Sequence, residues 1–226
     1  SSAFYECTSL ESINLPAALT KIGNYAFRGC MKLSEADLPS GLKTMGTNAF
    51  EGCTSLTSIE IPKSLTTIES GSSGSPFEGC TGLKDITFED GLEKIPNYLF
   101  YDYTDLERIT ISDGVTEIGT GAFTGCSSLR LVTLPDGLKT VGNTVFSNCS
   151  ALSEIYFPHT VSSIGSNVFH NVPNITMLAN KDSFSATYAI ENGIPFKWVG
   201  GTLENTEDTF LDRNACQYLV DSQSSA

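Results

Sequence analysis

Residues 10–32 read LESINLPAALTKIGNYAFRGCMK, and this 23-residue pattern decides the fold. Its apolar residues form three groups, Leu-x-x-Ile-x-Leu-Pro, Leu-x-x-Ile-Gly and Ala-Phe-x-x-Cys. The pattern restarts at Leu10, Leu33, Leu56, Leu83, Leu106, Leu129 and Leu152, and a degenerate eighth copy opens at Ile175. Recurrence at such a period is typical of solenoids, in which each repeat buries its apolar face against the next.

A column of phenylalanines sets the register of the repeats. Its members are Phe4, Phe27, Phe50, Phe77, Phe100, Phe123, Phe146 and Phe169. The spacing is 23 residues throughout, except for one step of 27 between Phe50 and Phe77. The extra residues fall in the flexible stretch 70–76, which we expect to bulge from one coil. The unbroken register predicts a single elongated domain with these rings along one inner spine.

Each repeat predicts two short strands and a turn. In the first strand Ile13 and Leu15 point inward while Ser12 and Asn14 point out, and stacking pairs these strands into a parallel sheet. A second extended segment follows, and we expect its terminal glycine to relieve unusual backbone angles. Such glycines are Gly23, Gly46, Gly119, Gly142 and Gly165. The Ala-Phe-x-x-Cys piece predicts one helical or 3₁₀ turn per coil. The fold class is thus a strand-rich α/β repeat solenoid.

Six of the seven cysteines occupy one repeat position, three residues after the column phenylalanine. They are Cys7, Cys30, Cys53, Cys80, Cys126 and Cys149. Stacked neighbours would lie about 5 Å apart, but their Cβ bonds run parallel and do not converge as a disulfide requires. We therefore expect free, buried thiols. One thiol per coil does not form the local pair that zinc sites use, so we expect no metal. Cys216 stands apart in the tail, where we expect it to be exposed.

Charge and hydropathy exclude several classes of partner. The 26 acidic and 13 basic residues give a formal net charge of −13, which disfavours nucleic acid and anionic membrane surfaces. No run of 18 apolar residues occurs, so no membrane span is predicted. With two histidines, no Gly-x-Ser-x-Gly elbow and no complete phosphate-binding loop, the sequence predicts neither a Ser/His/Asp hydrolase nor a cofactor site.

The combined pattern Leu-x-x-Ile-x-Leu-Pro, Leu-x-x-Ile-Gly and Ala-Phe-x-x-Cys resembles the BspA-like leucine-rich repeats of bacterial and protist surface proteins, over residues 1 to about 178. Ordinary leucine-rich repeats carry an asparagine ladder and a longer helix, which this pattern lacks. The resemblance implies a right-handed leucine-rich-repeat superhelix with a parallel sheet. It also implies a secreted or cell-surface protein that adheres to host matrix or cell-surface proteins.

The outward positions of the first strands are the candidate binding site. If these strands form a concave sheet, that face carries Glu35, Asp37, Glu60, Asp85, Arg108, Leu131 and Tyr156. The first four form an acidic cluster, whereas Leu131 and Tyr156 are apolar anchors of the kind that interfaces favour. Two alternatives remain for the acids: a calcium site, or a glycosidase pair such as Asp37 with Glu60.

The two ends of the array differ in sequence. Residues 175–199 predict a closing helix and strand, so that the repeat domain spans residues 1–199. Residues 200–226 predict an acidic tail or linker. The chain begins inside what looks like an earlier coil, which predicts a piece of a longer protein. Phe4 and Tyr5 would then lie at an uncapped edge where copies self-associate.

Taken together, these patterns predict a non-enzymatic extracellular binding or adhesion module. The rival hypothesis is a structural spacer that presents another domain from the cell surface. A carbohydrate-active enzyme is a third possibility, and it would require paired carboxylates in a deep pocket.

Overall fold

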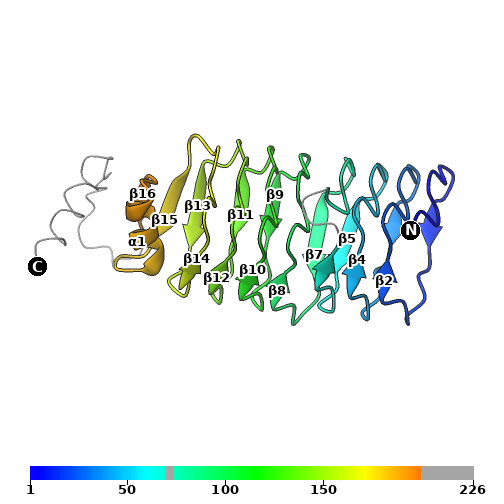
Figure 1. Cartoon of the computed structure of the whole chain (residues 1–226), viewed down its shortest axis with the longest axis horizontal. Coiled ribbons are helices and arrows are strands. Elements are labelled where there is room, and N and C mark those ends of the chain that lie inside the picture. Colours follow the sequence, from blue (N-terminus) through cyan, green and yellow to red (C-terminus); the bar gives the residue numbers. More distant parts are fainter. Residues whose placement is uncertain (70–73, 200–226) are drawn as a thin grey trace, which may run out of the picture.

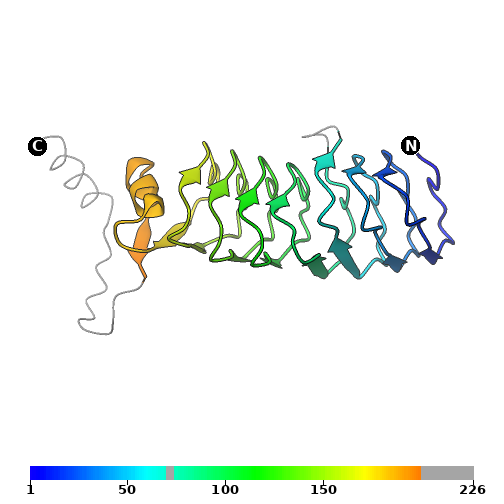
Figure 2. The same ribbon diagram turned by 90° about the horizontal axis from the view of Figure 1, so that it is seen from below.

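The computed structural model describes residues 1–69 and 74–199. Residues 70–73 and 200–226, with Cys216 and the predicted tail, lie outside the described residues. Figures 1 and 2 show an elongated row of coils, with the first strands along one long face and the second strands along the opposite face. We number the coils 1 to 8 from their first residues: 10, 33, 56, 83, 106, 129, 152 and 175.

Every coil contributes a first strand to one face. These strands are β1 (Ser12–Ile13), β3 (Glu35–Ala36), β5 (Ser58–Ile61), β7 (Asp85–Phe88), β9 (Arg108–Thr110), β11 (Leu131–Thr133), β13 (Glu154–Phe157) and β15 (Thr176–Ala179). They alternate between exposed and buried side chains as predicted; in β5, Ile59 and Ile61 are buried while Ser58 and Glu60 are exposed. Pairing is parallel wherever it occurs, but it is interrupted between β3 and β5, between β7 and β9, and between β11 and β13.

The second strands form the opposite face. They are β2 (Lys21–Ile22), β4 (Thr44–Met45), β6 (Thr67–Ile68), β8 (Lys94–Ile95), β10 (Glu117–Ile118), β12 (Thr140–Val141) and β14 (Ser163–Ile164). They pair in two parallel sheets, β2-β4-β6 and β8-β10-β12-β14, so the only interruption among the described second strands lies between β6 and β8. The last coil instead carries α1 (Phe184–Glu191) and β16 (Phe196–Trp198), and β16 pairs with β15. Ser183 caps α1 by accepting a hydrogen bond from the Ala186 amide.

The phenylalanine column forms a continuous stack, which confirms the predicted register. Neighbouring ring centroids from Phe4 to Phe169 lie 5.0–6.0 Å apart, and most planes are within 14° of parallel. The six rings from Phe27 to Phe146 are buried. Offset stacking at this distance adds to the free energy that burial of each ring contributes.

The cysteine column is also confirmed as free thiols, of which all but Cys7 are buried. Each buried thiol donates a hydrogen bond to the carbonyl of the column phenylalanine in the preceding coil, as Cys126 does to Phe100 at 3.2 Å. The sequence did not predict this bond. In coil 4 the position holds Tyr103, whose hydroxyl contacts the carbonyls of Cys80 at 2.9 Å and Leu83 at 3.0 Å.

The predicted helical turn in each coil is wrong for the described residues, where α1 is the only helix. The Ala-Phe-x-x-Cys piece and the residue before it form a series of tight turns, because two backbone positions there have positive φ: 57° at Tyr25 and 74° at Gly29 in coil 1. Alternate amides bond to the next coil instead of within a helix, as Phe27 N does to Ala49 O at 2.7 Å. A right-handed helix cannot form under either condition.

The reason predicted for the turn glycines is also wrong. Neither Gly142 nor its equivalents appear among the residues with positive φ. Instead, the coils approach so closely here that a Cβ on Gly142 would lie 2.6 Å from the Thr120 nitrogen in the preceding coil, and one on Gly46 would overlap the Asn24 nitrogen. These glycines therefore set the contact distance between coils.

Asparagine side chains join some pairs of neighbouring coils, although the contrast with ordinary leucine-rich repeats predicted no asparagine ladder. The side-chain oxygens of Asn24, Asn97 and Asn143 accept the backbone amides of Thr47, Thr120 and Ser166, respectively, at 2.9–3.1 Å. Each asparagine follows the turn position, so it satisfies an amide 23 residues further along the chain.

Candidate functional site

We call the outward side of the first strands the first-strand face. It is long and open, and the row of coils curves little in Figures 1 and 2. All seven predicted site residues lie on or beside these strands, and six are exposed while Tyr156 is half-buried. The face is thus a surface that a large partner can reach without any coil moving.

Four predicted residues lie together in an acidic hollow. Glu35, Asp37, Glu60 and Asp85 line a cavity of about 420 Å³ above the gap between β3 and β5. None of the four forms an ion pair within the described part of the chain, whereas six other carboxylates pair with lysine or arginine. Four uncompensated carboxylates give the hollow a negative potential, which attracts cationic groups and is screened by salt.

The two other chemistries considered for these acids gain no support. Within residues 1–69 and 74–199, no group of three or more His, Cys, Asp or Glu side chains is arranged to hold a metal ion. Asp37 and Glu60, the suggested glycosidase pair, are both exposed on an open face where water surrounds them. A glycosidase needs a site that excludes bulk water around the scissile bond.

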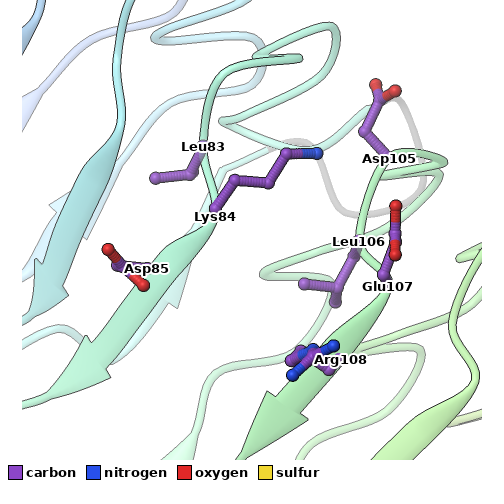
Figure 3. Close-up of a pocket in the computed structure, with 7 residues that line it drawn as sticks. All are labelled: Leu83, Lys84, Asp85, Asp105, Leu106, Glu107 and Arg108. Atoms are coloured by element: carbon purple, nitrogen blue, oxygen red, sulfur yellow. The ribbon is translucent and has the colours of Figure 1, made fainter.

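A second hollow lies between β7 and β9 and includes Arg108. Its volume is about 310 Å³, and the buried Leu83 and Leu106 lie among its lining residues. Figure 3 shows Lys84 and Asp85 on one side, and Asp105, Glu107 and Arg108 on the other. Glu107 pairs with Arg130 of the next coil at 2.6 Å, whereas Lys84 and Arg108 form no ion pair within the described residues. The sequence reasoning missed Lys84, Asp105 and Glu107, although Lys84 and Glu107 directly precede outward strand positions.

Leu131 and Tyr156 differ in their surroundings. Leu131 is 56% exposed and lies in register with Arg108 on the neighbouring strand. Tyr156 lies in register with Leu178, and its hydroxyl contacts the Asn180 side-chain oxygen at 3.0 Å. Burial, followed by the nearby Asp136 charge, raises the pKa of Tyr156. Leu131 is therefore a free apolar anchor, whereas Tyr156 also stabilises the last coils.

A further cluster, which the sequence reasoning missed, lies in the turn segments of the first coils. The Arg28 guanidinium lies 5.7 Å from the ring centre of Tyr5 and 5.5 Å from that of Tyr25, and both rings are exposed. Its Nε atom also pairs with Glu51 at 3.0 Å. The signal in the sequence was an Arg at the repeat position that holds Tyr5 one coil earlier.

Comparison with known families identifies the fold. Residues 1–73 and 73–189 match the profile of the BspA type leucine rich repeat region, in six copies. The chain belongs to this family. The BspA-type assignment agrees with the stacked phenylalanines and parallel strands described above. No curated protein shows significant sequence similarity to the chain.

Solved structures of other leucine-rich repeat proteins resemble this BspA-type array. A protein from Bacteroides ovatus ATCC 8483 is 28% identical, with a TM-score of 0.61, over 80% of this chain and 46% of its own. One from Eubacterium ventriosum ATCC 27560 is 30% identical, with a TM-score of 0.57, over 72% and 43%. The T. pallidum leucine-rich repeat protein is 27% identical, with a TM-score of 0.55, over 80% and 82%. The match thus spans less than half of the first two proteins.

Among the described residues, no helix has both the length and the apolar character needed to cross a membrane.

Proposed function

We propose that the chain is a non-enzymatic, extracellular or cell-surface module that binds proteins through its first-strand face. Its partner is a host matrix or cell-surface protein. Membership in the BspA-type family and the resemblance to bacterial leucine-rich repeat proteins support the class of function. We choose the first-strand face because it carries both an acidic hollow and the exposed Leu131.

The two parts of this face would contribute differently. Leu131 offers an apolar anchor next to Arg108, and such anchors dominate the binding energy of many interfaces. The four carboxylates of the acidic hollow would mainly increase the association rate of a cationic partner. The preferred partner therefore presents basic residues to coils 2–4 and an apolar side chain to coil 6.

The first experiment measures adhesion of the purified chain to immobilised matrix proteins and tests each partner that binds. Leu131→Ser is the test variant, because the side chain is 56% exposed and its loss leaves no cavity. Lys139→Ser, beside β12 on the opposite face, is the matched control. We expect at least tenfold weaker binding for Leu131→Ser, with Lys139→Ser unchanged. Equal binding by both variants and the parent would refute the role of Leu131.

The second experiment neutralises the hollow without changing its shape. Glu35→Gln, Asp37→Asn, Glu60→Gln and Asp85→Asn are combined, and Glu93→Gln beside β8 serves as a control for loss of surface charge. We expect the combined variant to associate more slowly and to lose the salt dependence of binding. An association rate that keeps the salt dependence of the parent would exclude the hollow from the interface.

The elongated shape favours the spacer as the second candidate function. A spacer needs length and rigidity but no specific surface. If no matrix or cell-surface protein binds, and variants of both faces leave the adhesion of whole cells unchanged, the spacer becomes the better description.

A further inference from the structure

The contact between coils 3 and 4 differs from every other contact between successive coils in coils 1–7. Its second strands do not pair, because the sheet β2-β4-β6 ends there and β8-β10-β12-β14 begins. A hollow of about 460 Å³, lined by Leu65, Leu92 and Pro96 among others, lies at this break. In the described residues, first-strand pairing between β5 and β7 is the main backbone ladder across this contact.

The turn segments are separated at the same place. In other coils a direct amide bond joins successive turn segments, such as Phe50 N to Pro76 O at 2.8 Å and Phe100 N to Ala122 O at 2.9 Å. Between coils 3 and 4 the hydroxyl of Ser75 intervenes, accepting from Phe77 N at 3.1 Å and donating to Leu99 O at 2.9 Å. A side chain thus replaces the backbone ladder there.

Core packing is looser at the same contact. Phe77 and Phe100 have the largest spacing and tilt in the stack, 6.0 Å and 26°. Tyr103 occupies the position that holds a smaller cysteine in the neighbouring coils, and its hydroxyl reaches back to coil 3. Pro96 stands where five of the other coils carry a glycine close to the preceding coil, although coil 3 carries Glu69 there. All three features fit a wider separation of the cores of coils 3 and 4.

On its other side, coil 4 is attached by a different edge. Coils 4 and 5 pair through β8 and β10 and through their turn segments, whereas β7 and β9 do not pair with each other and leave the hollow of Figure 3 between them. Coil 4 therefore holds coil 3 by one edge and coil 5 by the opposite edge. In Figure 2 the strands of coil 3 are offset from those of coil 4 in an otherwise nearly straight row.

We propose that coil 4 is a joint dividing the array into two units that unfold separately and bend relative to each other. In a solenoid each coil is stabilised only by its neighbours, so a weak contact between two coils uncouples the stability of the segments on either side. The N-terminal unit contains coils 1–3, and the C-terminal unit contains coils 5–8. Bending opens or closes the gap between β7 and β9, which changes the curvature of the first-strand face without disturbing either core.

The chain offers a direct test, because its single tryptophan, Trp198, lies in β16 at the far end of the C-terminal unit. Denaturant unfolding is followed by Trp198 fluorescence and by circular dichroism, which reports on all coils. The two variants are Phe50→Ala in coil 2 and Phe146→Ala in coil 6. Both rings are fully buried, and each is stacked between two others.

We expect Phe146→Ala to lower the denaturant midpoint of the Trp198 transition and Phe50→Ala to leave it unchanged. Circular dichroism should show the Phe50→Ala defect as an earlier, separate loss of signal. If the N-terminal unit of Phe50→Ala fails to fold while Trp198 keeps its native emission and midpoint, the proposal also holds. Phe50→Leu and Phe146→Leu repeat the comparison with smaller perturbations.

A reciprocal experiment moves the fluorescent tryptophan from the C-terminal unit to the N-terminal unit. In Tyr25→Trp combined with Trp198→Phe, the fluorescence reports on coil 1, and the midpoint should now respond to Phe50→Ala and not to Phe146→Ala. Equal shifts of the Trp198 midpoint by Phe50→Ala and Phe146→Ala would show a single cooperative array and overturn the proposal.

Discussion

The buried cysteine column makes the stability of the array depend on pH in the alkaline range. Burial, together with the neighbouring Cys53, raises the pKa of Cys30 from 9.0 to about 11. Burial also raises the pKa of Cys149 from 9.0 to about 12, against a smaller lowering by a hydrogen bond with the backbone of Cys126. The pKa of Cys126 is raised in the same direction, again mainly by burial. In each case the folded state keeps the thiol neutral where the unfolded chain would ionise it.

The sign of the effect follows from which state binds more protons. Below pH 9 both states hold the thiol proton and the contribution is fully present. Above pH 9 the unfolded chain releases the thiol proton. Each thiol with a raised pKa then lowers the free energy of unfolding by about 1.4 kcal/mol per pH unit, until the pH reaches the pKa of the folded state. For Cys149 this amounts to about 2.7 kcal/mol at about pH 11.

The assay compares urea unfolding of the parent and Cys149→Val from about pH 8 to about pH 11, with reductant present. Valine fits this column, because Val172 occupies it in coil 7. Lysine and tyrosine ionisation affects both proteins alike, so the difference isolates one thiol. We expect the parent to lose about 1.4 kcal/mol more per pH unit than the variant above about pH 9.5. Parallel pH profiles would refute the assignment of a neutral, buried thiol.

Three further changes test the packing between coils. Phe123→Ala should lower the free energy of unfolding by about 3 to 5 kcal/mol, because the ring is fully buried between Phe100 and Phe146; a thermal melt like that of the parent would contradict the stack. Gly142→Ala should cost about 1 to 3 kcal/mol, since its Cβ would lie 2.6 Å from Thr120 N. Gly137→Ala, whose Cβ would meet Asp113 O only at 3.4 Å, is the control, and equal melting temperatures would exclude the close approach. Tyr103→Phe should cost about 1 to 3 kcal/mol in chemical denaturation, because two buried carbonyls lose their hydroxyl contact, and an unchanged midpoint would show that this contact does not stabilise the fold.

Much of the fold could be predicted because it depends on side-chain periodicity. The spacing of the phenylalanine column predicts the coils and their stack, and alternation in segments such as 58–61 predicts which side chains face the core. The parallel Cβ directions of stacked cysteines exclude disulfides between them. These are properties of a regular repeat, so one coil provides the information for all.

The parts that could not be predicted depend on the distance between coils. Gly142 is required by a backbone atom in the preceding coil, and nothing in its own segment indicates this contact. The tight turns at Tyr25 and Gly29 arise because their amides bond to another coil, so local helix propensity gave the wrong result. The interrupted ladders and the hollows beside them likewise depend on small differences in spacing.

The candidate site also has a part that the sequence predicts and a part that depends on the distance between coils. The outward positions of Glu35, Asp37, Glu60 and Asp85 follow from strand alternation, but their convergence on one hollow depends on the gap between β3 and β5. The free position of Leu131 follows from the pattern as well. The hydrogen bond from Tyr156 to Asn180 does not, since it joins residues of two coils that depart from the consensus.

Because most contacts join equivalent positions of adjacent coils, a regular coil outside the contact between coils 3 and 4 can be removed or repeated as a unit. Excising residues 106–128, or duplicating them, would bring equivalent edges together and would alter the length of the array in steps of about 4.8 Å. The separation between the acidic hollow and Leu131 would change by the same increment. The distance between these two parts of the first-strand face can therefore change in units of one repeat. Gain or loss of a single repeat would match that distance to the spacing of two attachment points on a partner.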